Sequence, residues 1–484
     1  MKLKELIRGI DILEIHADPE ICIHNVVYDT RKNIGPGDLF VAISGFAFDG
    51  NSYIDQALAQ GAVAVVTAKK PAKDIPYILV SSDRLALAVL GINFFGDPAK
   101  SMKMIGVTGT NGKTSVTLLI KHVLETVLGA KVGLIGTMEN RIGQEVIPTD
   151  RTTPESFELQ QLLAAMRDAG CQYCVMEVSS HAIALERVGG MEFDIAAFTN
   201  LTEDHLIFHK TMENYCDTKA QLFHRCKAAV FNGDDIWYSR ISAGITCPVI
   251  TTAVNGEGML RAENVSMQAQ KVSFVAVYGE HKVEVSLPIP GKFTVYNALT
   301  VLSTVLQLGI SLSDAAAALA TAPGVKGRVE VVPTPGKPYT VLIDYAHTPD
   351  GLENVLSSVR SFCKGRLIAV FGCGGDRDSG KRPIMGKIGT ELSDFTIITS
   401  DNPRNEEPLD IIQDILKGVS ANQGTYVVIE DRRKAIRYAM DKAQKDDIIV
   451  LAGKGHETYQ EIRGVKYPLD EREIVNAYLM ETEN

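Results

Sequence analysis

Residues 108–114, with the sequence TGTNGKT, have the types and spacing needed to bind the phosphates of a nucleotide. Their glycines let backbone N–H groups point towards an anion, and the helix expected after them adds positive potential. Lys113 can reach the terminal phosphates, and the Thr114 hydroxyl can bind Mg²⁺. The segment predicts a site for ATP or GTP, although the strict motif has glycine in place of Val107, and a surface turn is the alternative. The predicted contacts are Gly109, Thr110, Asn111, Gly112, Lys113 and Thr114.

Three further polar residues stand where they could serve the same chemistry. Glu177 ends a hydrophobic run, where phosphate-loop enzymes place a carboxylate that completes Mg²⁺ coordination; a surface glutamate is the alternative. His205 follows a strand expected over residues 195–199, and a lone histidine is usually structural. Lys219 shares a helical face with Tyr215 and Phe223, which is typical of a lysine that passes aromatic rings to reach water.

The elements that must position these residues alternate between strand and helix, which predicts an α/β protein. At 484 residues and 45% hydrophobic content, the chain is long enough for about three domains. We expect an N-terminal α/β domain over 1–98, a central phosphate-loop ATPase domain over 99–327 and a C-terminal domain over 328–484. The C-terminal strands, expected near 339–344, 367–371, 395–399, 426–429 and 448–451, predict a Rossmann-like, doubly wound parallel sheet.

Composition narrows the choice of partners. A net charge of −10 argues against a general surface for nucleic acid or membrane, so an anionic ligand needs a built site. No signal peptide or apolar run long enough to cross a bilayer is recognisable. The eight cysteines are scattered, which favours a reducing cytoplasm, and we expect a monomer.

Four motifs in order, TGTNGKT, EVSSH, NLTEDH and Y-x-x-x-K-A-x-L-F, resemble those of the Mur ligase family over essentially the whole chain. These enzymes form amide bonds with ATP in peptidoglycan precursor synthesis, and hence serve cell wall biogenesis, cell shape and cell division. The resemblance implies a three-domain architecture, two Mg²⁺ sites and a CO₂-derived carbamate on the lysine. A carbamate agrees with the chemistry, because an ammonium would repel Mg²⁺ whereas carbamate oxygens bind it. The implied catalytic residues are Lys113, Glu177, His205 and Lys219; Thr114 and Glu177 would hold one Mg²⁺, and His205 and N-carboxylated Lys219 the other.

Narrower motifs resemble the branch of the family that adds meso-2,6-diaminopimelate to UDP-N-acetylmuramoyl-L-alanyl-D-glutamate. The resemblance implies that this nucleotide substrate is bound by Thr30, Thr152, Thr153, Ser179 and Arg187. Without the family, the run Thr152, Thr153, Pro154 would be interpreted as a helix cap, and Arg187 as a solvated charge.

The C-terminal region resembles the diaminopimelate site of that branch. Its sequence DNPR ends in Arg404, and an arginine fork matches the second carboxylate of diaminopimelate, which lysine lacks. The implied contacts are Arg377, Asp401, Asn402, Arg404, Gly453 and Glu457. Taken alone, GCGGDRD and GKGHE would also suit solvent-exposed turns.

The resemblance places the adenosine contacts at Asn297, Arg328 and Asp344. Two positions depart from the family pattern: Thr294 replaces an asparagine that would contact adenine, and Ile207 replaces an aspartate near the metal site. The implied reaction transfers the γ-phosphoryl group of ATP to the D-glutamate γ-carboxylate, and the diaminopimelate amine then displaces phosphate. The alternatives are a lysine-adding Mur ligase, a ligase similar to folylpolyglutamate synthetase, and a non-catalytic scaffold.

Overall fold

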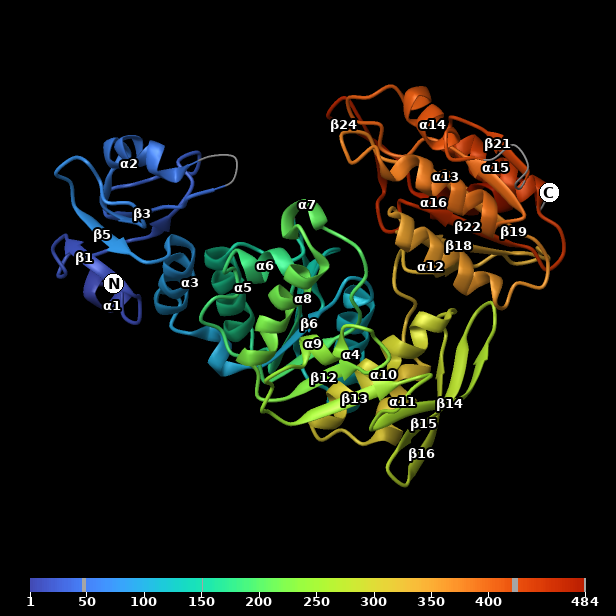
Figure 1. The fold of residues 1–484 in the computed structure, drawn as a ribbon, viewed down its shortest axis with the longest axis horizontal. Coiled ribbons are helices and arrows are strands. Elements are labelled where there is room, and N and C mark those ends of the chain that lie inside the picture. Colours follow the sequence, from blue (N-terminus) through green and yellow to red (C-terminus); the bar gives the residue numbers. More distant parts are fainter. Residues whose placement is uncertain (46–48, 150, 420–424, 483–484) are drawn as a thin grey trace. The chain divides into compact units, whose positions relative to one another are not determined.

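A computed structural model describes residues 1–45, 49–149, 151–419 and 425–482. The chain divides into two compact units, one made of residues 1–231 and 235–250 and the other of 232–234 and 251–484 (Figure 1). Both units are built from strands and helices, so the predicted α/β class is confirmed. The exact boundaries of the three expected domains stay a prediction.

The first unit begins with a five-stranded sheet whose strand order is β1-β5-β4-β3-β2. Strands β2 to β5 are parallel and β1 is antiparallel to β5. Apolar side chains such as Leu39, Val41 and Val66 are fully buried and form its core. The elements are α1 (Leu3–Leu6), β1 (Ile12–His16), β2 (Val26–Val27), β3 (Asp38–Ala42), η1 (Gly50–Tyr53), α2 (Ile54–Gln60), β4 (Ala62–Thr67), β5 (Tyr77–Val80) and α3 (Asp83–Phe94).

The same unit continues into a second sheet, in which β12, β11, β6, β10 and β7 run parallel in that spatial order, followed by β8 and β9. Glu177 pairs in register with Val107, so the carboxyl ends of β10 and β6 lie side by side. The strands are β6 (Lys103–Thr108), β7 (Val132–Ile135), β8 (Asn140–Ile142), β9 (Glu145–Ile147), β10 (Tyr173–Glu177), β11 (Ile195–Phe198) and β12 (Ala229–Asn232). The helices are η2 (Pro98–Ser101), α4 (Lys113–Leu128), α5 (Ser156–Asp168), α6 (Ser180–Ala184), α7 (Leu206–His209), α8 (Met212–Ala220), η3 (Gln221–Arg225) and α9 (Tyr238–Ile241).

The second unit begins with four strands, and helix α10 packs against two of them, β14 and β15. Strands β14, β15 and β16 form an antiparallel meander, and β13 runs parallel to β14. Most of α10 is buried, and its Thr304 and Thr300 hydroxyls donate to carbonyls one turn back. The elements are β13 (Val249–Ala253), β14 (Leu260–Met267), β15 (Val272–Tyr278), β16 (His281–Leu287), α10 (Lys292–Gln307) and α11 (Leu312–Ala320).

A six-stranded sheet of order β17-β18-β22-β19-β20-β21 completes the second unit. Its last five strands are parallel, and helices pack on both faces, as the sequence predicts for a doubly wound sheet. Thr348 caps α12 by accepting from the Gly351 N–H, and Pro349 occupies the first turn of the helix. The elements are β17 (Glu330–Val332), β18 (Thr340–Asp344), α12 (Pro349–Arg360), β19 (Leu367–Phe371), α13 (Lys381–Leu392), β20 (Phe395–Ile398), α14 (Pro408–Leu416), β21 (Thr425–Val428), α15 (Arg432–Lys442), β22 (Ile448–Ala452), β23 (Tyr459–Ile462), β24 (Val465–Pro468) and α16 (Glu471–Thr482).

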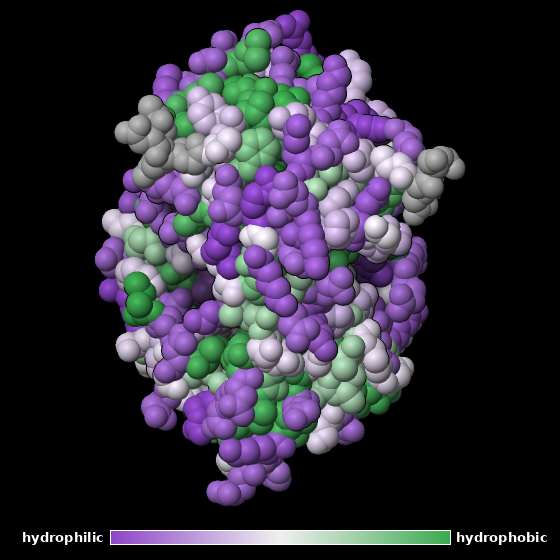
Figure 2. All heavy atoms as spheres, turned by 90° about the vertical axis from the view of Figure 1, so that its right-hand side faces the viewer, coloured by the Kyte–Doolittle hydropathy of each residue, from purple (hydrophilic) through white to green (hydrophobic). Residues whose placement is uncertain are grey.

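On the face drawn in Figure 2, hydrophilic side chains cover much of the surface and hydrophobic side chains gather in separate patches. Within the described ranges, no helix combines the length and apolar character required to cross a membrane.

Candidate active site

The segment TGTNGKT forms the turn between β6 and α4, as the sequence predicts. Gly109 and Gly112 have φ angles of 147° and 85°, which side chains other than glycine rarely adopt. A Cβ atom on Gly109 would lie only 1.9 Å from the Thr199 hydroxyl. Lys113 Nζ donates to the carbonyls of Gly109 and Thr110 at 3.0 and 2.7 Å, so its ammonium lies over the loop at the N-terminus of α4. This geometry suits phosphate binding.

The NLTEDH segment supports the loop from the neighbouring strand end. Asn200 accepts from the Thr110 N–H through its carbonyl and from the Asn111 N–H through its side chain, at 2.8 and 2.9 Å. The Thr199 hydroxyl donates to the Asn111 carbonyl at 2.6 Å. Sequence reasoning missed both supporting residues, although their place at the end of β11 was a signal that could have found them.

Glu177 is fully buried at the end of β10, so the alternative of a surface glutamate is wrong. Its two carboxylate oxygens accept from the Thr137 N–H at 2.9 Å and from the Thr137 hydroxyl at 3.0 Å. Both donors are neutral groups, and a carboxylate at this strand end is a type of ligand that Mg²⁺ prefers. Thr137 is a further residue that the sequence interpretation missed.

Lys219 is also buried, with 1% exposure, so the alternative in which its ammonium reaches water is wrong. Nζ donates to the Gly109 carbonyl at 2.9 Å and lies 4.6 Å from the centre of the Tyr215 ring. This hydrogen bond is therefore to a neutral backbone carbonyl and not to a carboxylate. Burial lowers the pKa of Lys219 well below its usual value, because water no longer stabilises the ammonium. An amine in this state can react with CO₂, so the site fits a carbamate.

His205 lies beyond β11 in a left-handed conformation, with φ of 56°. Nearly half of its side chain is exposed, and Nε2 lies 3.3 Å from Asp204 Oδ2. Burial of the ring lowers the pKa of His205, which favours the neutral imidazole that binds metals. No cluster of three or more His, Cys, Asp or Glu side chains suited to a metal occurs in the part of the chain that the structure describes. Cation binding would therefore need other oxygens, such as those of Thr114, a modified lysine and the nucleotide.

Four of the predicted nucleotide-substrate residues lie next to Glu177. The Thr153 hydroxyl donates to the Glu177 carbonyl at 2.9 Å and accepts from the Ser179 N–H at 3.3 Å. Arg187 Nη1 donates to the Thr153 carbonyl at 3.0 Å, and its side chain is only 13% exposed. Thr152 is within hydrogen-bond distance, 3.0 Å, of the Thr137 hydroxyl.

These contacts overturn two alternatives. The helix that follows, α5, has Glu155 at its N-cap and no side-chain cap, so the threonines do not cap it. Arg187 is not a solvated charge, because its Nε also lies 3.4 Å from a Glu155 carboxylate oxygen.

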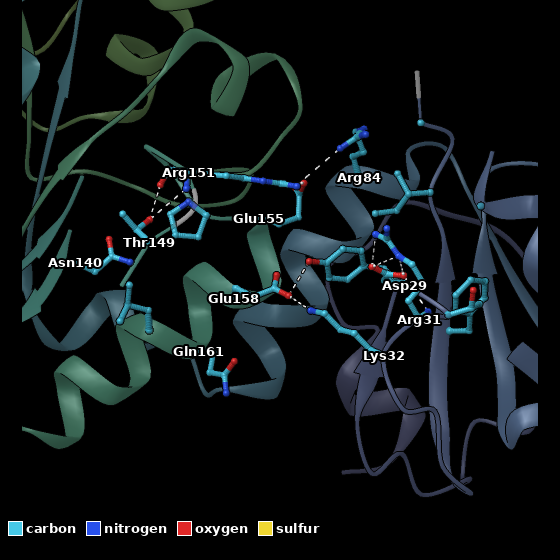
Figure 3. A pocket seen from close by; sticks show the side chains of 18 of the residues that line it. Asp29, Arg31, Lys32, Arg84, Asn140, Thr149, Arg151, Glu155, Glu158 and Gln161 are labelled. Carbon is cyan, nitrogen blue, oxygen red and sulfur yellow. Dashed lines mark hydrogen bonds and ion pairs between the residues drawn. The ribbon is translucent and has the colours of Figure 1, made fainter. Parts of the chain in front are cut away.

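The fifth such residue, Thr30, lines a different part of the first unit, a pocket of about 870 Å³ (Figure 3). There the Tyr28 hydroxyl donates to Glu158 at 2.6 Å, and Lys32 pairs with the same carboxylate. Basic side chains that sequence reasoning missed also line the pocket: Arg31, Lys32, Arg84 and Arg151. The carboxylates of Asp29, Glu155 and Glu158 line the pocket too and pair with these basic side chains, so the pocket carries both signs of charge.

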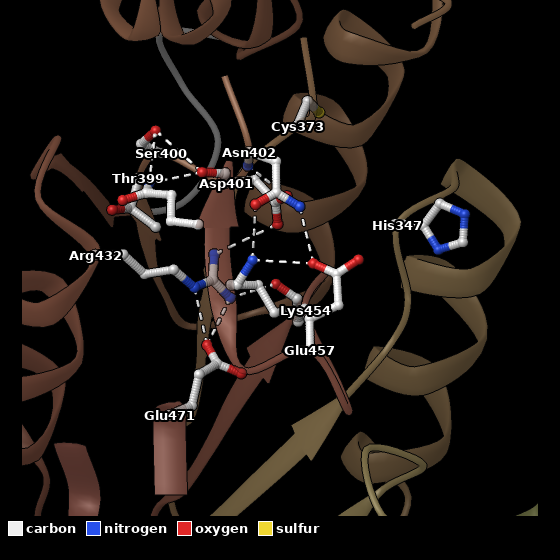
Figure 4. Close-up of polar contacts among 12 residues, drawn as sticks. His347, Cys373, Thr399, Ser400, Asp401, Asn402, Arg432, Lys454, Glu457 and Glu471 are labelled. Atoms are coloured by element: carbon white, nitrogen blue, oxygen red, sulfur yellow. Dashed lines mark hydrogen bonds and ion pairs between the residues drawn. The ribbon is translucent and has the colours of Figure 1, made fainter. Parts of the chain in front are cut away.

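The predicted amino-acid contacts from DNPR and GKGHE meet in the second unit (Figure 4). Asn402 Nδ2 donates to Glu457 Oε2 at 2.8 Å, and the fully buried Lys454 contacts both residues. A Cβ atom on Gly453 would lie 2.8 Å from Asp401 Oδ2, so glycine allows that carboxylate to pack against the chain. The exposed-turn alternative is therefore wrong for GKGHE.

The two arginines of this region differ in exposure. Arg404 has φ of 50°, is 20% exposed, and donates from Nη1 to the Gly375 carbonyl at 2.8 Å. Its Nε lies 3.3 Å from Glu461 Oε2. Arg377 is exposed and donates to the carbonyl of Asp376 at 3.0 Å, so this part of GCGGDRD is an exposed turn.

The predicted adenosine contacts all lie in the second unit. The Arg328 guanidinium lies 4.8 Å from the centre of the Tyr345 ring. Asp344 accepts from the N–H groups of Val329 and Ala346, both at 2.8 Å, and burial raises its pKa. Asn297 is buried on α10. At the two departures, the Thr294 hydroxyl donates to the Pro290 carbonyl at 2.9 Å and Ile207 is 81% exposed.

Comparisons with known proteins identify relatives over the whole chain. Three family profiles match: "Mur ligase family, catalytic domain" over residues 22–91, "Mur ligase middle domain" over 107–305, and "Mur ligase, glutamate ligase domain" over 327–455. A UDP-N-acetylmuramoyl-L-alanyl-D-glutamate--2,6-diaminopimelate ligase of Caldanaerobacter subterraneus subsp. tengcongensis is 47% identical over 486 residues, which cover 100% of both chains. A protein of the same name from Clostridium tetani is also 47% identical, over 99% of this chain and 100% of its own. A solved structure of a ligase of that name is 30% identical, with a TM-score of 0.74 and coverage of 100% of this chain and 99% of its own.

Proposed function

The chain belongs to the Mur ligase family, and from this premise we propose that it joins meso-2,6-diaminopimelate to UDP-N-acetylmuramoyl-L-alanyl-D-glutamate with ATP. The observation that carries the proposal is the 47% identity, over the full length of both chains, to a relative named for this reaction. The reaction belongs to peptidoglycan precursor synthesis. The product would be an amide on the D-glutamate γ-carboxylate, together with ADP and phosphate.

The phosphate loop would act first. A γ-carboxylate oxygen of D-glutamate attacks the γ-phosphorus of ATP, the bond to the bridging oxygen breaks, and ADP leaves. The Lys113 ammonium would stabilise the negative charge on the phosphoryl oxygens during the transfer, because it already lies over the carbonyls of the phosphate loop. The amine of diaminopimelate then attacks the carbonyl of the acyl phosphate, loses a proton, and expels phosphate.

The buried polar groups beside the loop fit a divalent cation. Mg²⁺, when bound, would neutralise phosphate charge during transfer. Thr114 and Glu177 would hold one ion, and His205 with N-carboxylated Lys219 a second. Support for the carbamate is the Lys219 amine itself, which is buried against a carbonyl without a carboxylate partner among the described residues.

The amino acid would be bound by the DNPR and GKGHE segments. Arg404 is held at Nη1 and at its backbone, which fixes the direction of the guanidinium before any ligand arrives. We propose that Arg404 and Arg377 receive the distal carboxylate, that Glu457 receives an ammonium group, and that Asp401, Asn402 and Gly453 complete the site. Asn297, Arg328 and Asp344 would bind the adenosine of ATP.

Because the reaction uses ATP and a nucleotide precursor, we propose the cytoplasm as the location of the protein. For the oligomeric state we propose a monomer.

Amino-acid-dependent phosphate release tests the proposal. The purified chain is given ATP, Mg²⁺, bicarbonate and UDP-N-acetylmuramoyl-L-alanyl-D-glutamate, with either meso-diaminopimelate or L-lysine. Release with diaminopimelate alone supports the proposal, and release with lysine alone would reassign the amino acid. Release only with a folate acceptor would favour the folylpolyglutamate alternative, and no release with any acceptor would favour a scaffold.

A further inference from the structure

The side chain of Lys454 is fully buried although it carries an ammonium group. Nζ donates to Asn402 Oδ1 at 3.0 Å and to Glu457 Oε2 at 3.0 Å, and it lies 5.6 Å from the centre of the Tyr459 ring. Burying an ammonium is costly unless it is paired with a carboxylate and hydrogen-bonded. The folded chain therefore constrains the positions of both partners.

The contacts around Lys454 leave one orientation for the Asn402 amide. Oδ1 accepts from Lys454 Nζ and also from the Glu461 N–H, at 3.0 Å each. A flipped amide would turn its NH₂ group towards these two donors, so the oxygen must face them. The NH₂ group consequently faces Glu457, and Nδ2 donates to Oε2 at 2.8 Å.

Both donors meet Glu457 at the same oxygen. Among the described residues, Glu457 Oε2 accepts one hydrogen bond from Lys454 and one from Asn402. The Glu457 side chain is 16% exposed, so the carboxylate can be reached from solvent while Oε2 is held by both donors. Figure 4 shows Lys454 between Asn402 and Glu457.

We propose that Lys454 is a positioning residue for the amino-acid substrate: it fixes Asn402 and Glu457 so that Glu457 Oε1 is presented to a substrate ammonium. This inference rests on the proposed function. A neutral side chain at 454 would remove two charge-assisted hydrogen bonds and leave Glu457 able to rotate. The affinity for the diamino acid should fall, whereas ATP and the nucleotide substrate should bind as before.

The test compares Lys454→Met with Lys466→Met. Lys466 is a matched control, because it is exposed and its Nζ lies 4.3 Å from the centre of the same Tyr459 ring. We expect Lys454→Met to raise the KM for meso-diaminopimelate by at least about tenfold, with the KM values for ATP and the nucleotide substrate little changed. Lys466→Met should leave all of these values near those of the wild type.

A second comparison separates positioning from general damage to the fold. If Lys454 acts through Glu457, the double variant Lys454→Met, Glu457→Gln should have the same KM for diaminopimelate as Glu457→Gln alone. Lys454→Gln, which keeps a neutral donor, is measured in the same way in case the methionine variant unfolds. An unchanged KM for diaminopimelate, a parallel rise in all three KM values, or additive effects in the double variant would overturn the inference. Failure of the wild type to release phosphate with any amino acid would instead refute the proposed function.

Discussion

Replacing Arg404 by lysine should show whether the substrate carboxylate is recognised by the planar shape of the guanidinium or by its positive charge alone. The guanidinium is 20% exposed, donates to the Gly375 carbonyl at 2.8 Å and lies 3.3 Å from Glu461 Oε2. Lysine keeps the positive charge but loses the planar fork that pairs with a carboxylate. Loss of one charge-assisted hydrogen bond costs about 1.5–3 kcal/mol, which corresponds to roughly a 10- to 150-fold fall in kcat/KM for meso-diaminopimelate.

Arg463→Lys is the matched control for this change. Arg463 has φ of 49°, close to the 50° of Arg404, but its side chain is 74% exposed and pairs with Glu407 on the surface. Exposed pairs contribute about 0–1 kcal/mol, so the control should keep nearly full activity. Steady-state phosphate release at varied diaminopimelate measures both variants. A fall of similar size in both, or full activity in Arg404→Lys, would refute the assignment of Arg404 to the substrate carboxylate.

Three other changes test the loop, the C-terminal core and a buried carboxyl group. Gly109→Ala places a Cβ atom 1.9 Å from a threonine hydroxyl and should raise the KM for ATP by at least about tenfold, whereas Gly129→Ala meets open space and should not. Arg432→Met leaves the fully buried Glu471 without its 2.8 Å ion pair and should lower the unfolding free energy by about 3–5 kcal/mol in urea titrations; a loss below about 1 kcal/mol contradicts this reasoning. Burial raises the pKa of Asp344, so the folded chain holds this proton where the unfolded chain releases it. The stability of the wild type relative to Asp344→Asn should therefore be greatest below about pH 4 and should fall as the pH rises through the raised pKa, and thermal unfolding that shows no such trend would contradict this.

Local patterns predicted the elements of this chain well. The five C-terminal strands were predictable because each is a short apolar run bounded by polar residues, and β19 matches its predicted bounds at both ends. The phosphate loop was predictable because its glycines need conformations that few other residues adopt.

Burial and long-range contacts could not be derived from local patterns. Lysine is usually exposed, so neither Lys219 nor Lys454 could be recognised as buried without the strands that surround them. Thr137 supports Glu177 from 40 positions away in the sequence, and no periodicity links the two. The alternative in which the two threonines before α5 cap that helix is wrong, because their hydroxyl groups contact residues at neighbouring strand ends instead.

Transfer of a labelled oxygen tests the central claim most directly. The nucleotide substrate is prepared with ¹⁸O in the γ-carboxylate of D-glutamate and incubated with ATP, Mg²⁺ and meso-diaminopimelate. If the chain forms the amide through an acyl phosphate, one labelled oxygen should appear in the released phosphate for each amide formed. Amide formation with unlabelled phosphate, or phosphate release without a tripeptide product in the mass spectrum, would contradict the account.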